Sequence, residues 1–111
     1  MNKGQEMPTP IPEIDEDGFL IDSEKWSREI AEILAQKDVP QGLTEDHWTV
    51  VAFMRDYYQT FGTVPPVRML SRRTNLSLRR IKLLFPSGLT KGACKIAGIP
   101  MVTIRPNFLY P

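Results

Sequence analysis

The sequence has 111 residues and is poor in the side chains that metal and redox sites require. It contains one cysteine, Cys94, and one histidine, His47. A single cysteine excludes an intramolecular disulfide framework and is typical of a reducing cytoplasm, and these two residues do not make a zinc site. Glycine-rich phosphate loops and a usable Ser/His/Asp pattern are also missing. We therefore expect no cofactor, no metal and no autonomous enzymatic activity.

Long apolar runs are missing as well. The longest extends from Val50 to Met54, whereas a membrane helix needs roughly 20 apolar residues. Residues 1–10 are polar and rich in proline, without the apolar stretch of a secretory signal. These features predict a cytoplasmic protein without membrane contact. We expect a flexible leader over residues 1–10, a single domain over 11–100 and a C-terminal arm over 101–111.

Acidic side chains are absent from the second part of the chain, although the formal net charge is only +1. Residues 1–66 carry 5 basic and 13 acidic side chains, a net charge of −8, and residues 67–111 carry 9 basic and none acidic, a net charge of +9. The molecule is therefore polarised. A basic half of this kind attracts acidic surfaces, either nucleic acid or protein.

The hydrophobic pattern predicts an α+β fold that is mostly α. Apolar residues on both sides of the acidic turn at 15–18 predict a small β-hairpin over 11–21. Capping residues and apolar periodicity predict helices over about 22–36, 44–61, 66–74, 77–85 and 90–97. The helix over 44–61 is apolar around most of its circumference, so we expect it to be central and buried on more than one side. The apolar arm should dock on another surface, and an exposed apolar segment also invites self-association. We therefore expect a monomer or a weak homo-oligomer.

Two short predicted helices on either side of Thr74 are strongly basic. Their cations are Arg68, Arg72, Arg73, Arg79, Arg80 and Lys82. Two short helices joined by a tight turn resemble a helix-turn-helix, whose second helix can enter the major groove of DNA. The alternative is a solvated face, or a face that meets an acidic protein. Both interpretations remain open at this point.

Cys94 is the one candidate nucleophile, and it lies between Lys91 and Lys95. If a helix begins near Thr90, the thiol lies in its first turn, where the helix dipole and the lysines lower a cysteine pKa. The small Gly92 and Ala93 beside it would leave room for a reagent. The alternative is a cysteine buried as a small hydrophobe.

Several blocks of the sequence resemble the DsrC/TusE family, which includes the gamma subunit of dissimilatory sulfite reductase. They are DEDGFL (15–20), LTEDHW (43–48), FMRDYYQTFGTVPPVRML (53–70), LFPSG (84–88) and KGACKIAGIP (91–100), within a match over about residues 13–100. The resemblance implies a small helical fold with an N-terminal hairpin, a helix-turn-helix-like segment and a C-terminal arm. It also implies a cytoplasmic role in sulfur metabolism, in which a cysteine carries sulfur between partner proteins.

The same resemblance implies two cysteines, one in the KGACKIAG block and one in the arm. Cys94 matches the first, whereas Arg105 occupies the position of the second. This suggests a partner-binding or regulatory paralogue that meets sulfite reductase or sulfurtransferase proteins, rather than a two-cysteine sulfur carrier. The alternatives are a DNA-binding regulator and a single-cysteine persulfide carrier that uses Cys94. Lys91 and Lys95 join the six cations of the helix pair as candidate partner-binding residues.

Overall fold

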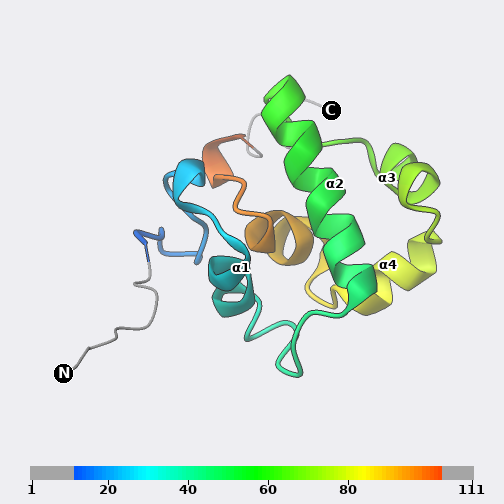
Figure 1. Ribbon diagram of the computed structural model, residues 1–111, viewed down its shortest axis with the longest axis horizontal. Helices are drawn as coiled ribbons and strands as arrows, with labels where there is room; N and C mark the ends of the chain where they lie inside the picture. The colour runs from blue at the N-terminus through cyan, green and yellow to red at the C-terminus, as the bar shows by residue number, and fades with distance from the viewer. Residues whose placement is uncertain (1–11, 104–111) are drawn as a thin grey trace.

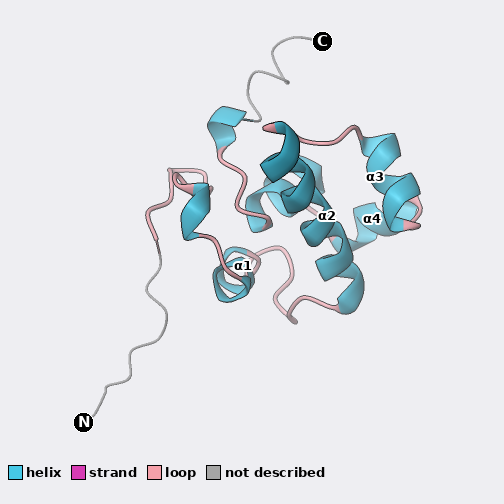
Figure 2. Ribbon diagram, turned by 45° about the horizontal axis from the view of Figure 1, so that its top comes forward, coloured by secondary structure: helices cyan, strands magenta, loops and turns pink. Residues whose placement is uncertain are grey.

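A central helix, α2 (Glu45–Phe61), is the element around which the others pack (Figure 1). The structure, a computed structural model, describes residues 12–103. Before α2 come a 3₁₀ turn, η1 (Ser23–Lys25), and α1 (Arg28–Leu34); after it come α3 (Val67–Thr74), α4 (Leu78–Leu84) and a π-helical segment, η2 (Leu89–Cys94). Helix α2 contacts α3, α4 and η2. The described residues are helices and loops (Figure 2), so the expectation of a mostly helical fold is confirmed. None of their helices has the length and apolar character needed to cross a membrane.

The limits of α2 agree with those predicted. Thr44 is the N-cap and Gly62 the C-cap, and Gly62 ends the helix with a φ of 73° in the left-handed region that favours glycine. Burial of α2 is less even than expected. The side chains on its inner face are buried, but Phe61 in its last turn is 64% exposed. The prediction of a central helix is right, and the prediction of burial on more than one side is wrong at this end.

The N-terminal hairpin predicted over 11–21 is not confirmed. Residue 11 lies outside the described residues, and residues 12–21 contain one isolated antiparallel bridge between Ile14 and Leu20 in place of paired strands. The Asp15 side chain accepts hydrogen bonds from the backbone N–H groups of Asp17 and Phe19. A short acidic side chain that binds nearby N–H groups offers the backbone an alternative to a strand ladder. The turn nevertheless buries Phe19 and Leu20 completely or almost so.

The continuous helix predicted over 22–36 is divided into η1 and α1. Trp26 and Ser27 between them are extended, and the Ser27 hydroxyl caps α1 by accepting the Ile30 N–H. The Trp26 indole N–H donates to the Ile96 carbonyl at 2.8 Å, and the Arg55 guanidinium lies 4.5 Å from the centre of its ring. These contacts with distant segments favour an extended Trp26 over the helical conformation that the local pattern predicts.

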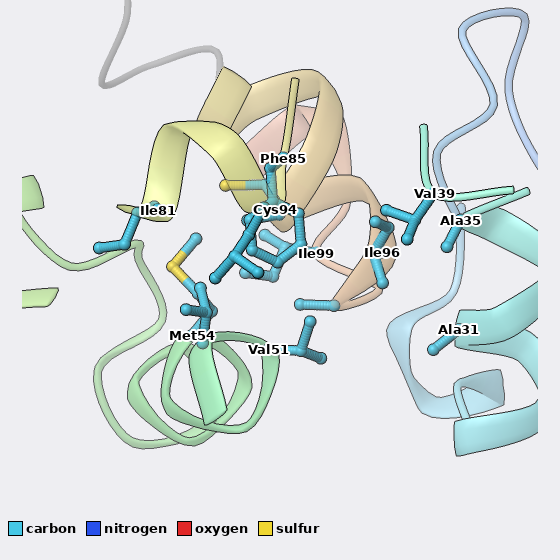
Figure 3. Packing of buried hydrophobic residues seen from close by; sticks show 14 of the residues in the cluster. Ala31, Ala35, Val39, Val51, Met54, Ile81, Phe85, Cys94, Ile96 and Ile99 are labelled. Atoms are coloured by element: carbon cyan, nitrogen blue, oxygen red, sulfur yellow. The ribbon is translucent and has the colours of Figure 1, made fainter. Parts of the chain in front are cut away.

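The main core joins side chains from every part of the fold. Figure 3 shows Ala31, Ala35 and Val39 from around α1 facing Ile96, while Val51 and Met54 of α2 face Ile99 and Cys94. A second small cluster forms where Leu20 packs on Ile30 and Leu34 of α1. The 15–18 turn therefore connects both clusters, because its Phe19 enters the main core.

The buried His47 joins the start of α2 to the end of α4. Its Nε2–H donates to the Leu84 carbonyl at 2.8 Å, and its Nδ1 accepts the Thr44 N–H at 3.0 Å. The ring also meets Phe85 edge-on, with ring centroids 5.2 Å apart. Both imidazole nitrogens therefore have hydrogen-bond partners, which explains how the His47 side chain can be only 3% exposed.

We expect His47→Ala to lower the free energy of unfolding by about 2–3 kcal/mol, because it leaves a buried carbonyl without a donor and opens a void. Chemical denaturation measures the loss. His47→Asn is the matched control, since its amide can still accept the Thr44 N–H and should lose less. A cost below about 0.5 kcal/mol for the alanine variant would contradict this role.

Candidate functional site

Cys94 lies inside the core and not at a helix start. It is the last residue of η2 and only 3% exposed, and its sulfur points toward α4 on the side of Ile81 and Phe85 (Figure 3). The expectation that the thiol occupies the first turn of a helix is therefore wrong. The helix begins at Leu89, and by the time the chain reaches Cys94 it has turned into the protein interior.

The environment of Cys94 suppresses the thiolate. Burial away from water raises the pKa of the thiol from its ordinary value of 9.0 to about 12. The neighbouring lysines do not reverse this effect, because Lys91 is exposed and the Lys95 side chain extends to the 15–18 turn, where its Nζ lies 3.2 Å from the place that a Cβ on Gly18 would occupy. The predicted lowering of the Cys94 pKa is therefore contradicted.

Gly92 in the same block allows close packing and does not create access to the thiol. A Cβ at this position would lie 2.9 Å from Asp38 Oδ2 and 3.0 Å from Phe85 Cβ. The other oxygen of the Asp38 carboxylate accepts both the backbone N–H and the hydroxyl of Ser87, at 2.9 and 2.6 Å. The glycine thus lets η2 approach this hydrogen-bonded turn and Phe85.

The basic helix pair forms as predicted, with Ser77 capping α4 and Asn75 in the left-handed conformation between the helices. Its cations, however, do not form a single face. Arg80 pairs with Asp46 of α2, with Nη2 and Oδ2 3.0 Å apart. Arg73 lines a hollow between α2 and α3, and Lys82 lines a second hollow beside α4. Arg68, Arg72 and Arg79 are exposed. Lys95 lies at the other end of the molecule, near the blue N-terminal turn of Figure 1.

The hollow beside α4 is lined mainly by apolar side chains. It has a volume of about 270 Å³ and is lined by Val67, Leu78, Ile81, Lys82, Phe85, Gly88 and Leu89. Ile81 and Phe85 also belong to the core cluster that contains Cys94. The floor of the hollow is therefore continuous with the packing that covers the thiol.

Arg55 is an organising residue that the sequence analysis missed. Its guanidinium donates to the Ser23 carbonyl, the Ser23 hydroxyl and the Ala97 carbonyl, at 2.9–3.1 Å. Burial lowers its pKa, and the nearby Tyr58 acts in the opposite direction. The available signal was its position three to four residues from Val51 and Tyr58, on the apolar face of α2. An arginine on such a face needs buried carbonyl partners.

Comparison with known proteins assigns the chain to a family. The model of DsrC-like proteins matches residues 8–103, which include all of the described residues 12–103. The chain belongs to the DsrC-like family. Among the relatives of this DsrC-like chain is the gamma subunit of dissimilatory-type sulfite reductase from Nitratidesulfovibrio vulgaris, 42% identical over 82% of this chain and 87% of the relative. Another is the sulfurtransferase TusE of Pectobacterium atrosepticum, 42% identical over 78% of this chain and 84% of the relative.

Solved structures agree with this assignment. The oxidised gamma subunit of dissimilatory sulfite reductase from Archaeoglobus fulgidus superimposes with a TM-score of 0.71, at 44% identity over 80% of this chain and 87% of that one. A dissimilatory sulfite reductase I structure gives a TM-score of 0.75, at 42% identity over 79% of this chain and 85% of that one. The resemblance seen in the sequence blocks is thereby confirmed, and so is the connection of the family to sulfur metabolism.

Proposed function

We propose that this DsrC-like chain is a partner-binding, regulatory member of its family, which docks on proteins of the sulfite reductase or sulfurtransferase type in cytoplasmic sulfur metabolism. The observation that carries the proposal is the state of its one cysteine. Cys94 is buried and its pKa is raised to about 12, so the group that would accept sulfur is both covered and protonated at neutral pH. Arg105, which replaces the expected arm cysteine, cannot form a persulfide in its place.

The two alternatives have less support. A single-cysteine carrier requires Cys94 to meet a persulfide donor, and the packing of Ile81 and Phe85 stands against this. A DNA-binding regulator requires a cluster of cations on one face, whereas Arg80 is engaged by Asp46 and Arg73 lies in the hollow on the α2 side. The exposed cations that remain suit an acidic protein surface as well as a phosphate backbone.

The proposal is tested by measuring binding and sulfur transfer separately. We expect the chain to bind a purified dissimilatory sulfite reductase or a TusE-type sulfurtransferase complex, and to gain no sulfur after incubation with a persulfide-loaded sulfurtransferase. Intact-mass spectrometry detects the addition of one sulfur atom, and Cys94→Ser is the control for its position. Arg105→Cys restores an arm thiol and should gain sulfur where the unchanged chain does not.

Two results would refute the proposal. Sulfur on Cys94 of the unchanged chain would identify a carrier. Failure to bind any of these sulfur enzymes, combined with salt-dependent binding that prefers one DNA sequence, would identify a DNA-binding regulator.

A further inference from the structure

We propose that the hollow beside α4 is the docking site for an acidic amphipathic helix of a partner protein. This inference rests on the proposed function, because it specifies the chemistry of the partner at one surface. The hollow is defined by Val67 of α3, the α4 face with Phe85 just beyond it, and Leu89 at the start of η2.

The shape and composition of the hollow suit a helix. Leu78, Ile81, Lys82 and Phe85 are spaced by three and four residues, so they form one continuous stripe along and just beyond α4. Leu78 is 49% exposed and Val67 40% exposed, and these two bring apolar area to the rim while Ile81 and Phe85 make the floor. A groove of this kind accepts the apolar face of a helix, whose side chains repeat at the same spacing.

The charges around the hollow suit an acidic partner. The hollow is lined by a segment that contains no acidic side chain from Val67 to the end of the chain. Lys82 is part of the lining, and the bordering helices α3 and α4 also carry the exposed Arg68 and Arg79. An approaching acidic segment therefore meets cations beside an apolar floor, which speeds encounter and fixes orientation.

The carboxylates hydrogen-bonded to this region include Asp46, which pairs with Arg80 of α4, and Asp38, which accepts from Ser87. Asp38 is half-buried, and one of its oxygens already accepts two hydrogen bonds. Neither carboxylate is part of the lining of the hollow.

The same observations disfavour the other occupants. A volume of about 270 Å³ lies below the roughly 300–1,000 Å³ of pockets that enclose small-molecule ligands. Residues 104–111 carry Arg105 and no acid, so the chain's own arm would add like charge. A second copy would also bring like charge if it approached through its own basic residues 67–111. DNA phosphates require cations but do not require the apolar floor made by Ile81 and Phe85.

A selection experiment determines the chemistry that the hollow accepts. A library of random 16-residue peptides is displayed and selected on the full chain, and the winners are measured by fluorescence anisotropy. We expect peptides with apolar residues at intervals of three and four, flanked by Asp and Glu, whose affinity falls at least tenfold between low and high salt. Enrichment of basic or neutral peptides, or no enrichment, would overturn the inference.

Two matched pairs of variants locate the binding. Leu78→Asp should weaken the selected peptides at least tenfold, whereas Leu83→Asp, on the same helix, 67% exposed and outside the lining, should change binding less than twofold. Lys82→Glu should weaken binding at least tenfold at low salt, whereas Lys25→Glu, which is exposed in η1 and outside the lining, should change it less than twofold. Equal effects within either pair would refute the assigned site.

Further experiments distinguish the acidic helix from the other possible occupants of the hollow. Deletion of residues 104–111 should leave peptide affinity within twofold, and a gain above tenfold would show that the arm fills the hollow. A duplex DNA that binds the unchanged chain and is lost with Leu78→Asp would also overturn the inference. Binding of sulfur enzymes that persists in Leu78→Asp would refute this docking site and leave the proposed function standing, because that function is measured with the enzymes themselves.

Discussion

The folded chain should react with a thiol reagent about a thousandfold more slowly than the unfolded chain at the same pH. The pKa of Cys94 is raised from 9.0 to about 12, and each unit lowers the thiolate fraction about tenfold at a fixed pH. Only the thiolate reacts, so the fold suppresses the reaction even before the steric cover of Ile81 and Phe85 is considered. Because Cys94 is the only cysteine in the sequence, the signal comes from one residue.

Stopped-flow labelling in buffer and in urea at pH 8 measures this ratio, and Cys94→Ala gives the background. Labelling of the folded chain within tenfold of the urea rate would contradict a buried, protonated thiol and would favour the single-cysteine carrier. Such a result would also remove the main support for a binding role.

The same shift predicts the sign of a pH effect on stability. The folded pKa lies above the unfolded one, so the contribution of the thiol to stability is fully present below about pH 9 and is lost as the pH rises toward about 12. In that window unfolding releases a proton that the folded state retains. Urea denaturation at several pH values should show a decline above pH 9 that is smaller in Cys94→Ala.

Gly98→Ala should be the most damaging glycine-to-alanine substitution in the described structure. A Cβ there would collide with Trp26 Cδ1 and lie 2.8 Å from Trp26 Cγ, and the backbone φ of 74° is strained for alanine. The tryptophan cannot easily move, because its indole donates to the Ile96 carbonyl and Arg55 packs over its ring. We expect a loss of about 3 kcal/mol or more, of which the left-handed backbone accounts for about 1–2 kcal/mol.

Gly62→Ala is the matched control for this prediction. Gly62 has a φ of 73°, and nothing lies within 4 Å of the position of its Cβ. It therefore carries the same backbone penalty without the collision, and the difference between the two variants in urea denaturation measures the contact with Trp26. Equal losses would show that Trp26 relaxes freely, which would contradict its role in fixing the extended segment between η1 and α1.

Local residue chemistry predicted most of the helix boundaries. Thr44 and Gly62 limit α2, and Ser77 and Asn75 set the turn between α3 and α4. These signals act within one turn of the backbone, so they can be recognised without knowing the fold. The motif blocks likewise carried the family resemblance, which the family model over residues 8–103 confirms.

The limits of local reasoning appear where distant segments meet. Trp26 interrupts a predicted helix because its indole N–H donates to the carbonyl of Ile96, seventy residues away. Arg55 likewise acquires its role from carbonyls in Ser23 and Ala97. A hydrophobic or charge pattern does not encode such partners, because they depend on how the elements are packed.

The sequence by itself determined that this protein is a polarised, mostly helical member of a sulfur-metabolism family with one cysteine and an arginine in its arm. Only the tertiary structure decided what that cysteine can do. The lysines beside Cys94 suggested a reactive thiolate, but desolvation depends on every segment that covers the sulfur, and these come from α2, α4 and the chain after η2. The tertiary structure also decided where the cations lie. Arg80 pairs with Asp46, whereas Arg73 and Lys82 line two different hollows, so basic residues that are close in sequence are separated in space.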